Sequence, residues 1–143
     1  MTEREVVRFK VYTKIRSLIA INTIFPYNEI DFNIGGTFDT ETYKYTIENA
    51  GTYLIGLSYN KNTDGNGGSV DIKYDRNNIT YHIHRSQSAE AVSNRTISAC
   101  IMNKFEVGDK VYVMCAFGNP KTNIATYTTD DIKNSFWGIR LDY

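Results

Sequence analysis

Residues 51–59 read Gly-Thr-Tyr-Leu-Ile-Gly-Leu-Ser-Tyr. Apolar and aromatic side chains fall at both odd and even positions: Tyr53, Leu54, Ile55, Leu57 and Tyr59. Successive side chains of a strand point to opposite faces, so this stretch predicts a strand that needs cover on both. One face would pack inside a sandwich and the other against a neighbouring subunit. We expect Tyr53, Ile55, Phe136 and Trp137 to lie either in the core or in that interface.

The composition favours an all-β chain. Of the 143 residues, 39 are β-branched (16 Ile, 15 Thr and 8 Val), whereas Ala and Leu together number 11. The 16 basic and 16 acidic residues cancel, which argues against a nucleic-acid partner. No apolar run in the sequence, Leu18–Ile21 included, is long enough to span a membrane. We treat residues 1–143 as one domain, with its core about residues 6–143.

Short alternating runs separated by turn residues predict a sandwich or barrel. The expected strands are Val7–Thr13, Ile19–Phe25, Thr42–Ile47, Thr52–Tyr59, Ser69–Tyr74, Ile79–Arg85, Thr96–Met102, Lys110–Phe117 and Ser135–Leu141.

The connections between these strands differ in length. By strand parity, the four-residue turns lie at the end where the C-terminus emerges: Glu48–Gly51, Asp75–Asn78 and Glu106–Asp109. The longer polar loops gather at the opposite end: Asn60–Gly68, Ser86–Asn94 and Gly118–Asn134. Long loops on a rigid scaffold commonly carry binding residues. Polar planar groups and a Tyr ring suit sugar hydroxyls and sugar faces. The ligand-contact candidates are Asp64, Asn66, Tyr127, Asp130 and Asp131.

Three segments of the sequence carry a resemblance to a known family. The first is Phe32–Asp39 with Tyr45–Ile47 and Ala50–Ile55, which has an Asn-Gly, aromatic-Asp and Gly-x-Tyr pattern. The second is Phe105–Val113, which contains the Gly-Asp turn of a hairpin, and the third is Asn134–Leu141, which has a Ser-Phe-x-Gly-x-Leu pattern. In their order and spacing, the three segments together resemble the globular head of complement component one q.

The resemblance implies a ten-stranded antiparallel jelly roll, shared with tumour-necrosis-factor-like cytokines, that associates as a homotrimer. It also implies an extracellular recognition domain rather than an enzyme. No signal peptide is visible at the start of the chain, so we expect a mature domain of a secreted protein. The family's head often follows a collagen stem, and no Gly-x-y repeat precedes Val6.

Metal binding is a minor alternative. His82 and His84 are two apart on an expected strand, which would put both on one face, with Tyr81, Ile83 and Arg85 on the other. Residues 62–67 resemble the first half of a calcium loop, but Lys73 stands where such a loop needs a Glu. A looser calcium site with Asp71, or with Asp130 and Asp131, stays open, because some family members bind calcium near the apex of the head. No cofactor is required.

Two further features concern covalent chemistry. If Glu106 pairs with Asp109, the same register places Cys100 opposite Cys115, and we expect two buried reduced thiols, with a strained disulfide as the alternative. Asn78-Ile79-Thr80 and Asn94-Arg95-Thr96 have the form of N-glycosylation acceptors.

The sequence offers no support for catalysis, because it contains no nucleophile elbow, phosphate-binding Gly loop or paired Cys-x-x-Cys. The leading hypothesis is a homotrimeric, lectin-like pattern-recognition head of innate-immune type, which binds glycans or protein surface patches and gains affinity by avidity. The alternatives are a tumour-necrosis-factor-like cytokine that binds a cell-surface receptor, and a structural trimerisation cap.

Overall fold

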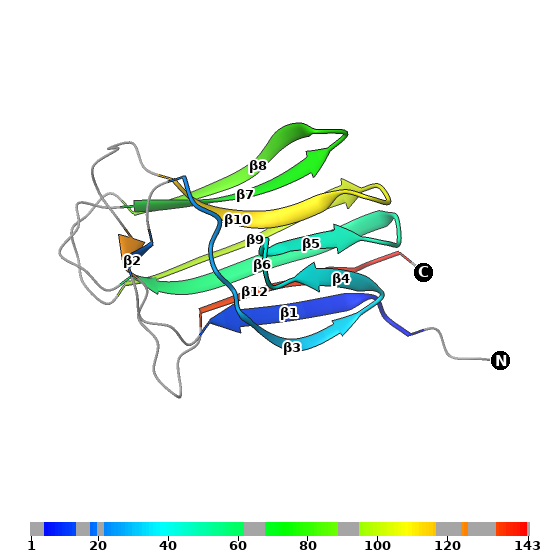
Figure 1. Cartoon of the computed structure of the whole chain (residues 1–143), viewed down its shortest axis with the longest axis horizontal. Helices are drawn as coiled ribbons and strands as arrows, with labels where there is room; N and C mark the ends of the chain where they lie inside the picture. The colour runs from blue at the N-terminus through cyan, green and yellow to red at the C-terminus, as the bar shows by residue number, and fades with distance from the viewer. Residues whose placement is uncertain are drawn as a thin grey trace.

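The protein is described here by a computed structural model that covers residues 5–13, 18–19, 22–61, 68–88, 95–116, 124–125 and 134–142. Two five-stranded antiparallel sheets pack face to face, as Figure 1 shows, and no helix occurs in these residues. The expected ten-stranded all-β jelly roll is therefore confirmed.

The first sheet has the order β3-β1-β12-β6-β9, and the second has the order β4-β5-β10-β7-β8. The first contains β1 (Arg8–Thr13), β3 (Glu29–Ile34), β6 (Gly51–Lys61), β9 (Arg95–Phe105) and β12 (Asn134–Arg140). The second contains β4 (Gly36–Asp39), β5 (Lys44–Ile47), β7 (Gly68–Arg76), β8 (Ile79–Ser88) and β10 (Lys110–Ala116). A two-residue pair, β2 (Leu18–Ile19) with β11 (Ile124–Ala125), lies outside both sheets.

Aromatic side chains fill the space between the sheets. The rings of Phe9 and Tyr45 stack at 3.8 Å between centroids and join the two layers, and Phe136 meets Phe9 edge-on at 5.1 Å. Gly138 faces this cluster, where an added Cβ would overlap the Phe9 ring. The missing side chain at position 138 therefore lets the Phe9 ring approach the strand closely.

Most of the expected strands are confirmed, but two segments differ. Among the described residues of the range 19–25, Ile19 belongs to β2, Asn22 has a positive φ of 61° and Ile24 forms an isolated bridge to Met114, so the expected single strand was wrong. Phe25 and Tyr27 instead bury their rings in the core. The reverse error concerns β3 and β4, which the alternation did not predict because β3 is largely exposed.

The two ends of the sandwich differ as expected. The turn between β7 and β8 is a two-residue one, Asn77-Asn78, which is shorter than the predicted Asp75–Asn78. It lies with the other short turns at the end where both described chain ends emerge (Figure 1). The strand ends at Lys61, Gly68 and Ser88 meet at the opposite end, since Gly68 pairs with Ser88 and Lys61 with Arg95.

Candidate functional site

The outer surface of the first sheet carries an exposed group of apolar side chains, which we call the apolar face. Cross-strand partners share a face, and here Ile139 lies opposite Leu54 and Leu54 opposite Met102. Phe32 is 38 % exposed and Met102 is 64 % exposed. The apolar face consists of Phe32, Ile34, Leu54, Met102, Trp137 and Ile139.

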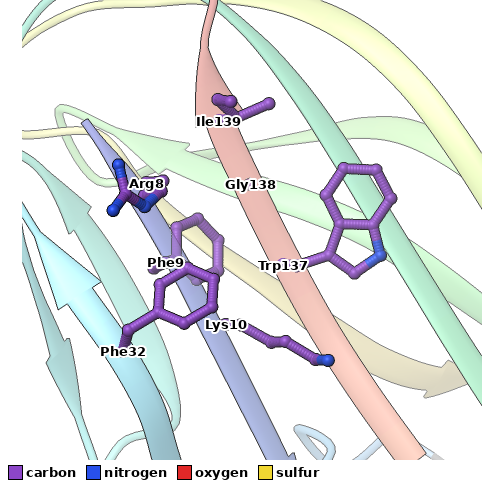
Figure 2. A pocket seen from close by; sticks show the side chains of 7 residues that line it. All are labelled: Arg8, Phe9, Lys10, Phe32, Trp137, Gly138 and Ile139. Atoms are coloured by element: carbon purple, nitrogen blue, oxygen red, sulfur yellow. The ribbon is translucent and has the colours of Figure 1, made fainter. Parts of the chain in front are cut away.

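Trp137 lies flat on this surface rather than in the interior. Its indole extends from β12 across β6, as Figure 2 shows, and covers Gly56, where an added Cβ would overlap the ring. A glycine at position 56 is therefore required for the indole to lie against the sheet. Trp137 is half-buried, so part of its side chain remains available for contact.

A hollow of about 390 Å³ lies beside Trp137 on the apolar face. Figure 2 shows its lining: Arg8, Phe9, Lys10, Phe32, Trp137, Gly138 and Ile139. The charged groups here have partners: the Arg8 guanidinium lies 5.8 Å from the centre of the Phe32 ring, and Lys10 pairs with Asp31 at 3.9 Å. Such a surface favours an apolar partner with a complementary shape.

The outer surface of the second sheet is charged instead. Asp71 has no exposed side-chain surface, and both of its oxygens accept hydrogen bonds from Arg85, at 2.7 and 2.9 Å. His82 Nε2 lies 3.4 Å from the same carboxylate. Burial acts to raise the pKa of Asp71, but Arg85, followed by His82, outweighs burial and lowers it.

The predicted core or interface residues separate into two groups. Tyr53, Ile55 and Phe136 lie in the core of the sandwich, and Trp137 lies on the apolar face. The Tyr53 hydroxyl donates a hydrogen bond to the Asn49 carbonyl at 2.7 Å, and burial raises the pKa of Tyr53 to about 12.

The proposed ligand contacts Asp64, Asn66, Tyr127, Asp130 and Asp131 lie outside the described residues, as does Asn94. Asn78 is exposed in the turn between β7 and β8, with a positive φ of 63°.

The expectation for the two histidines was wrong. A register shift in β8 places His82 opposite Lys73 and His84 opposite Ile72. Lys73 and Ile72 are consecutive, so the bulge turns the imidazoles to opposite faces of the sheet. His82 reaches Asp71, whereas His84 lies 3.0 Å from the Ser86 hydroxyl. Within the described residues, no group of three or more His, Cys, Asp and Glu side chains is arranged to hold a metal ion.

For the two cysteines, the expected reduced thiols are confirmed, but the expected cross-strand pairing and the burial of both side chains were wrong. β9 and β10 belong to different sheets, so the Glu106–Asp109 turn joins the two layers and is not a hairpin within one sheet. Cys100 lies opposite Gly56 and is exposed, and Cys115 lies opposite Val70 and is buried. Both are free thiols, and burial raises the pKa of Cys115 to about 12.

Four members of the apolar face were not singled out from the sequence: Phe32, Ile34, Met102 and Ile139. Ile139 had a detectable signal in the sequence. It follows Trp137 by two residues on the same strand, so the two side chains share a face, whereas the core residue Phe136 points to the other face. Phe32 and Met102 had none, because their outward direction depends on the register of the edge strands β3 and β9.

The two sheets and their strand orders define a jelly-roll sandwich of antiparallel strands. A family model of the C1q domain matches residues 9–139. The chain therefore belongs to the C1q domain family. Domains of this family and of its tumour-necrosis-factor-like relatives are generally non-enzymatic ligand-binding modules that typically form trimers, and C1q-domain proteins are typically extracellular.

Solved structures share this fold at low sequence identity. The globular domain of the zebrafish complement 1qA protein is 15 % identical with a TM-score of 0.76, and the match covers 96 % of this chain and 98 % of that one. The tumour necrosis factor Eiger from S. frugiperda is 11 % identical with a TM-score of 0.76, covering 97 % and 94 %. Murine APRIL at pH 5.0 is 8 % identical with a TM-score of 0.74, covering 96 % and 100 %.

A sequence comparison with curated proteins finds no match. Within the described part of the chain, no helix is long and apolar enough to cross a membrane.

Proposed function

We propose that this protein is a homotrimeric extracellular recognition domain, without enzymatic activity, that binds glycans or patches on protein surfaces. The exposed apolar face is the observation that carries the proposal. Phe32, Met102 and the outward face of Trp137 present apolar surface that a second copy of the chain would cover. The typical trimeric state of the family supports three copies.

Three copies held rigidly together present three equivalent binding sites. A weak site gains about a hundredfold or more in effective affinity when its target is multivalent. We keep Asp64, Asn66, Tyr127, Asp130 and Asp131 as proposed ligand contacts, to be tested by their substitution in a glycan-binding assay.

A cytokine-like role is the second candidate, because Eiger and APRIL share the fold as closely as the complement head does. Parallel screens against a sugar array and against cell-surface receptors separate the two roles. Binding to sugars that fails after loop substitution, without a receptor hit, supports the recognition domain; a receptor hit alone supports the cytokine. A stable trimer with no ligand in either screen supports a structural cap.

Assembly is tested by light scattering of the purified protein in a reducing buffer, which prevents the exposed Cys100 from cross-linking copies. We expect a mass about three times the 16.3 kDa of one chain. Leu54→Lys places a charge within the apolar face and should give folded monomers with an unchanged circular-dichroism spectrum.

Thr37→Lys is the matched control. Thr37 is exposed on the second sheet, where the same added charge lies beside Glu48, the acceptor of its hydroxyl hydrogen bond. This variant should keep the wild-type mass. A monomeric wild type at about 50 μM, or dissociation of Thr37→Lys as well, would contradict assembly through the apolar face.

A further inference from the structure

A second hollow, of about 360 Å³, opens on the outer surface of the second sheet, at the end that carries the short turns. In this sheet Lys110 lies opposite Asp75 and Asp75 opposite Thr80, so the three side chains share the outer face. We call it the polar hollow; its lining is Lys44, Asp75, Asn77, Asn78, Thr80, Gly108 and Lys110.

Asp75 is already engaged by three internal donors. It accepts hydrogen bonds from Lys44 Nζ at 2.9 Å, from the Thr80 hydroxyl at 2.8 Å and from the Tyr112 hydroxyl at 3.0 Å. Burial acts to raise its pKa, but these partners, Lys44 first, outweigh burial and lower it. The ionised carboxylate therefore neutralises Lys44 and is not free to repel an anionic ligand.

Lys110 has no such partner. Among the described residues, no carboxylate oxygen lies within 4.0 Å of its ammonium group, and its side chain is exposed. Asp39 interacts with it only weakly: the backbone N–H groups of Glu41 and Thr42 are the main causes of the lowered pKa of Asp39, and Lys110 is the smallest. The polar hollow therefore carries one positive charge that its own lining does not neutralise.

The rim of the hollow is rigid and rich in hydrogen-bonding groups. Asn77 and Asn78 form a two-residue turn with φ of 52° and 63°, closed by the pairing of Arg76 with Ile79. Their exposed carboxamides can both donate and accept hydrogen bonds. On the opposite wall, no atom lies within 4 Å of where a Cβ at Gly108 would stand, so space is open for a ligand.

These groups select one kind of ligand. The volume is at the lower end of small-molecule sites and fits one sugar ring rather than an oligosaccharide. Among the described residues, no aromatic ring lines the hollow, and the Lys44 ammonium lies over the nearby Tyr112 ring at 4.8 Å. A sugar ring therefore has no aromatic face to stack on here, and charge is the main source of affinity.

We infer that the polar hollow binds a monosaccharide unit that carries a carboxylate. Lys110 pairs with the carboxylate, and the carboxamides of Asn77 and Asn78 bind ring hydroxyls. The inference rests on the glycan-binding part of the proposed function and adds to it a site that is separate from the proposed loop contacts, because the described lining of the hollow includes none of those loop residues. The site lies on the sheet opposite the apolar face, so assembly and sugar binding can fail separately.

The test is an amide NMR titration of ¹⁵N-labelled protein whose mass shows no attached glycan, because a glycan on Asn78 would cover the rim. The probes are glucuronate, glucose and acetate. We expect glucuronate to shift the amides of Asn77, Asn78 and Gly108 with a millimolar dissociation constant. Glucose and acetate should each bind at least about tenfold more weakly, because each lacks half of the recognised groups.

Lys110→Gln should weaken glucuronate binding about tenfold. Lys73→Gln is the matched control: it removes the same charge from the outer face of the same sheet, but Lys73 does not line the hollow and contacts Met114 instead. Asn77→Gly keeps the positive-φ turn, removes one carboxamide and should weaken binding about fivefold.

Three results would overturn the inference. They are no saturable shifts with glucuronate, equal affinity for acetate or glucose, and equal losses in Lys73→Gln and Lys110→Gln. Light scattering of the same samples gives the oligomeric state independently. Monomers that still bind glucuronate would refute the assembly and leave the polar hollow standing.

Discussion

The two outer surfaces of the sandwich differ although both sheets pack the same kind of core between them. β6 places Leu54 and Gly56 on its outer side, with Trp137 of the neighbouring strand lying on Gly56. β7 places Asp71, Lys73 and Asp75 at the corresponding positions. One sheet thus has two apolar sides and needs a cover, whereas the other has a charged surface suited to water.

On the charged surface, the acidic side chains form ion pairs with neighbouring basic ones. Asp71 pairs with Arg85 and lies beside His82, and Asp75 pairs with Lys44, so most of the charges on this surface already have partners. On the apolar face, the one ion pair within the described part of the chain is that of Lys10 with Asp31, whose side chains are 42 % and 52 % exposed. An ion pair on the charged surface, where the Asp71 carboxylate is buried, therefore affects the free energy of unfolding more than the exposed pair on the apolar face.

The largest expected difference between the two surfaces is in the loss of unfolding free energy when one ion pair on each is broken. Arg85→Ala leaves the fully buried carboxylate of Asp71 with only His82 and should cost about 3 kcal/mol of unfolding free energy. Lys10→Ala should cost less than about 1 kcal/mol. Urea unfolding, followed by the fluorescence of Trp137, the one tryptophan, measures both in the Leu54→Lys background, where assembly does not contribute. Equal losses would refute the distinction.

Acid should lower the stability of the fold mainly by protonating carboxylates on the charged surface. The pKa of Asp75 is lower in the folded chain than the ordinary 3.8, so the folded state binds fewer protons. Its stabilisation is complete above the unfolded pKa and is lost as the pH falls through the lowered native value. Between about pH 5 and pH 2, the wild type should lose about 1 kcal/mol more than Asp75→Asn.

The matched variant for the acid experiment is Asp31→Asn, whose half-exposed pair lies on the other sheet. It should follow the wild-type acid limb in urea unfolding at each pH. The opposite result would contradict our interpretation. If Asp31→Asn reduces the loss of unfolding free energy at acid pH and Asp75→Asn does not, the acid-sensitive contacts lie on the first sheet.

The smallest expected difference between the two surfaces is in the salt dependence of their binding. Raising NaCl from about 0.05 M to about 0.5 M should leave the light-scattering mass unchanged, because burial of apolar surface is not screened. Over the same range, glucuronate binding in the polar hollow should weaken a few-fold, because Lys110 is exposed. Dissociation of the assembly by salt would indicate a mainly ionic interface.

The strongest local patterns predicted the central strands well, whereas the edge strands β3 and β4 were not predicted. β6 and β12 follow a dense apolar alternation, and each was placed to within two residues at its start. β3 is exposed along most of its length, so it shows no alternation to detect. The buried Phe25 and Tyr27 produced the opposite error, because apolar residues of a core-filling segment resemble those of a strand.

Two errors near the candidate sites came from pairing rather than from composition. The expected pair of Cys100 and Cys115 assumed that strands joined by a short turn belong to one sheet, whereas this turn crosses between sheets. The shared face of His82 and His84 assumed an unbroken pleat, and the bulge in β8 reverses it. A one-residue shift changes the face of a side chain without changing the sequence pattern.

The sequence by itself determined the class of fold and the surplus of apolar strand surface, because alternation, β-branched residues and turn residues act within a few neighbours along the chain. Only the tertiary structure decided which sheet carries that surplus, that Trp137 lies outward on Gly56, and that Lys110 lies among Asn77, Asn78 and Asp75. These placements depend on the register of strands distant in sequence, and register is a property of the packed sandwich rather than of any single strand.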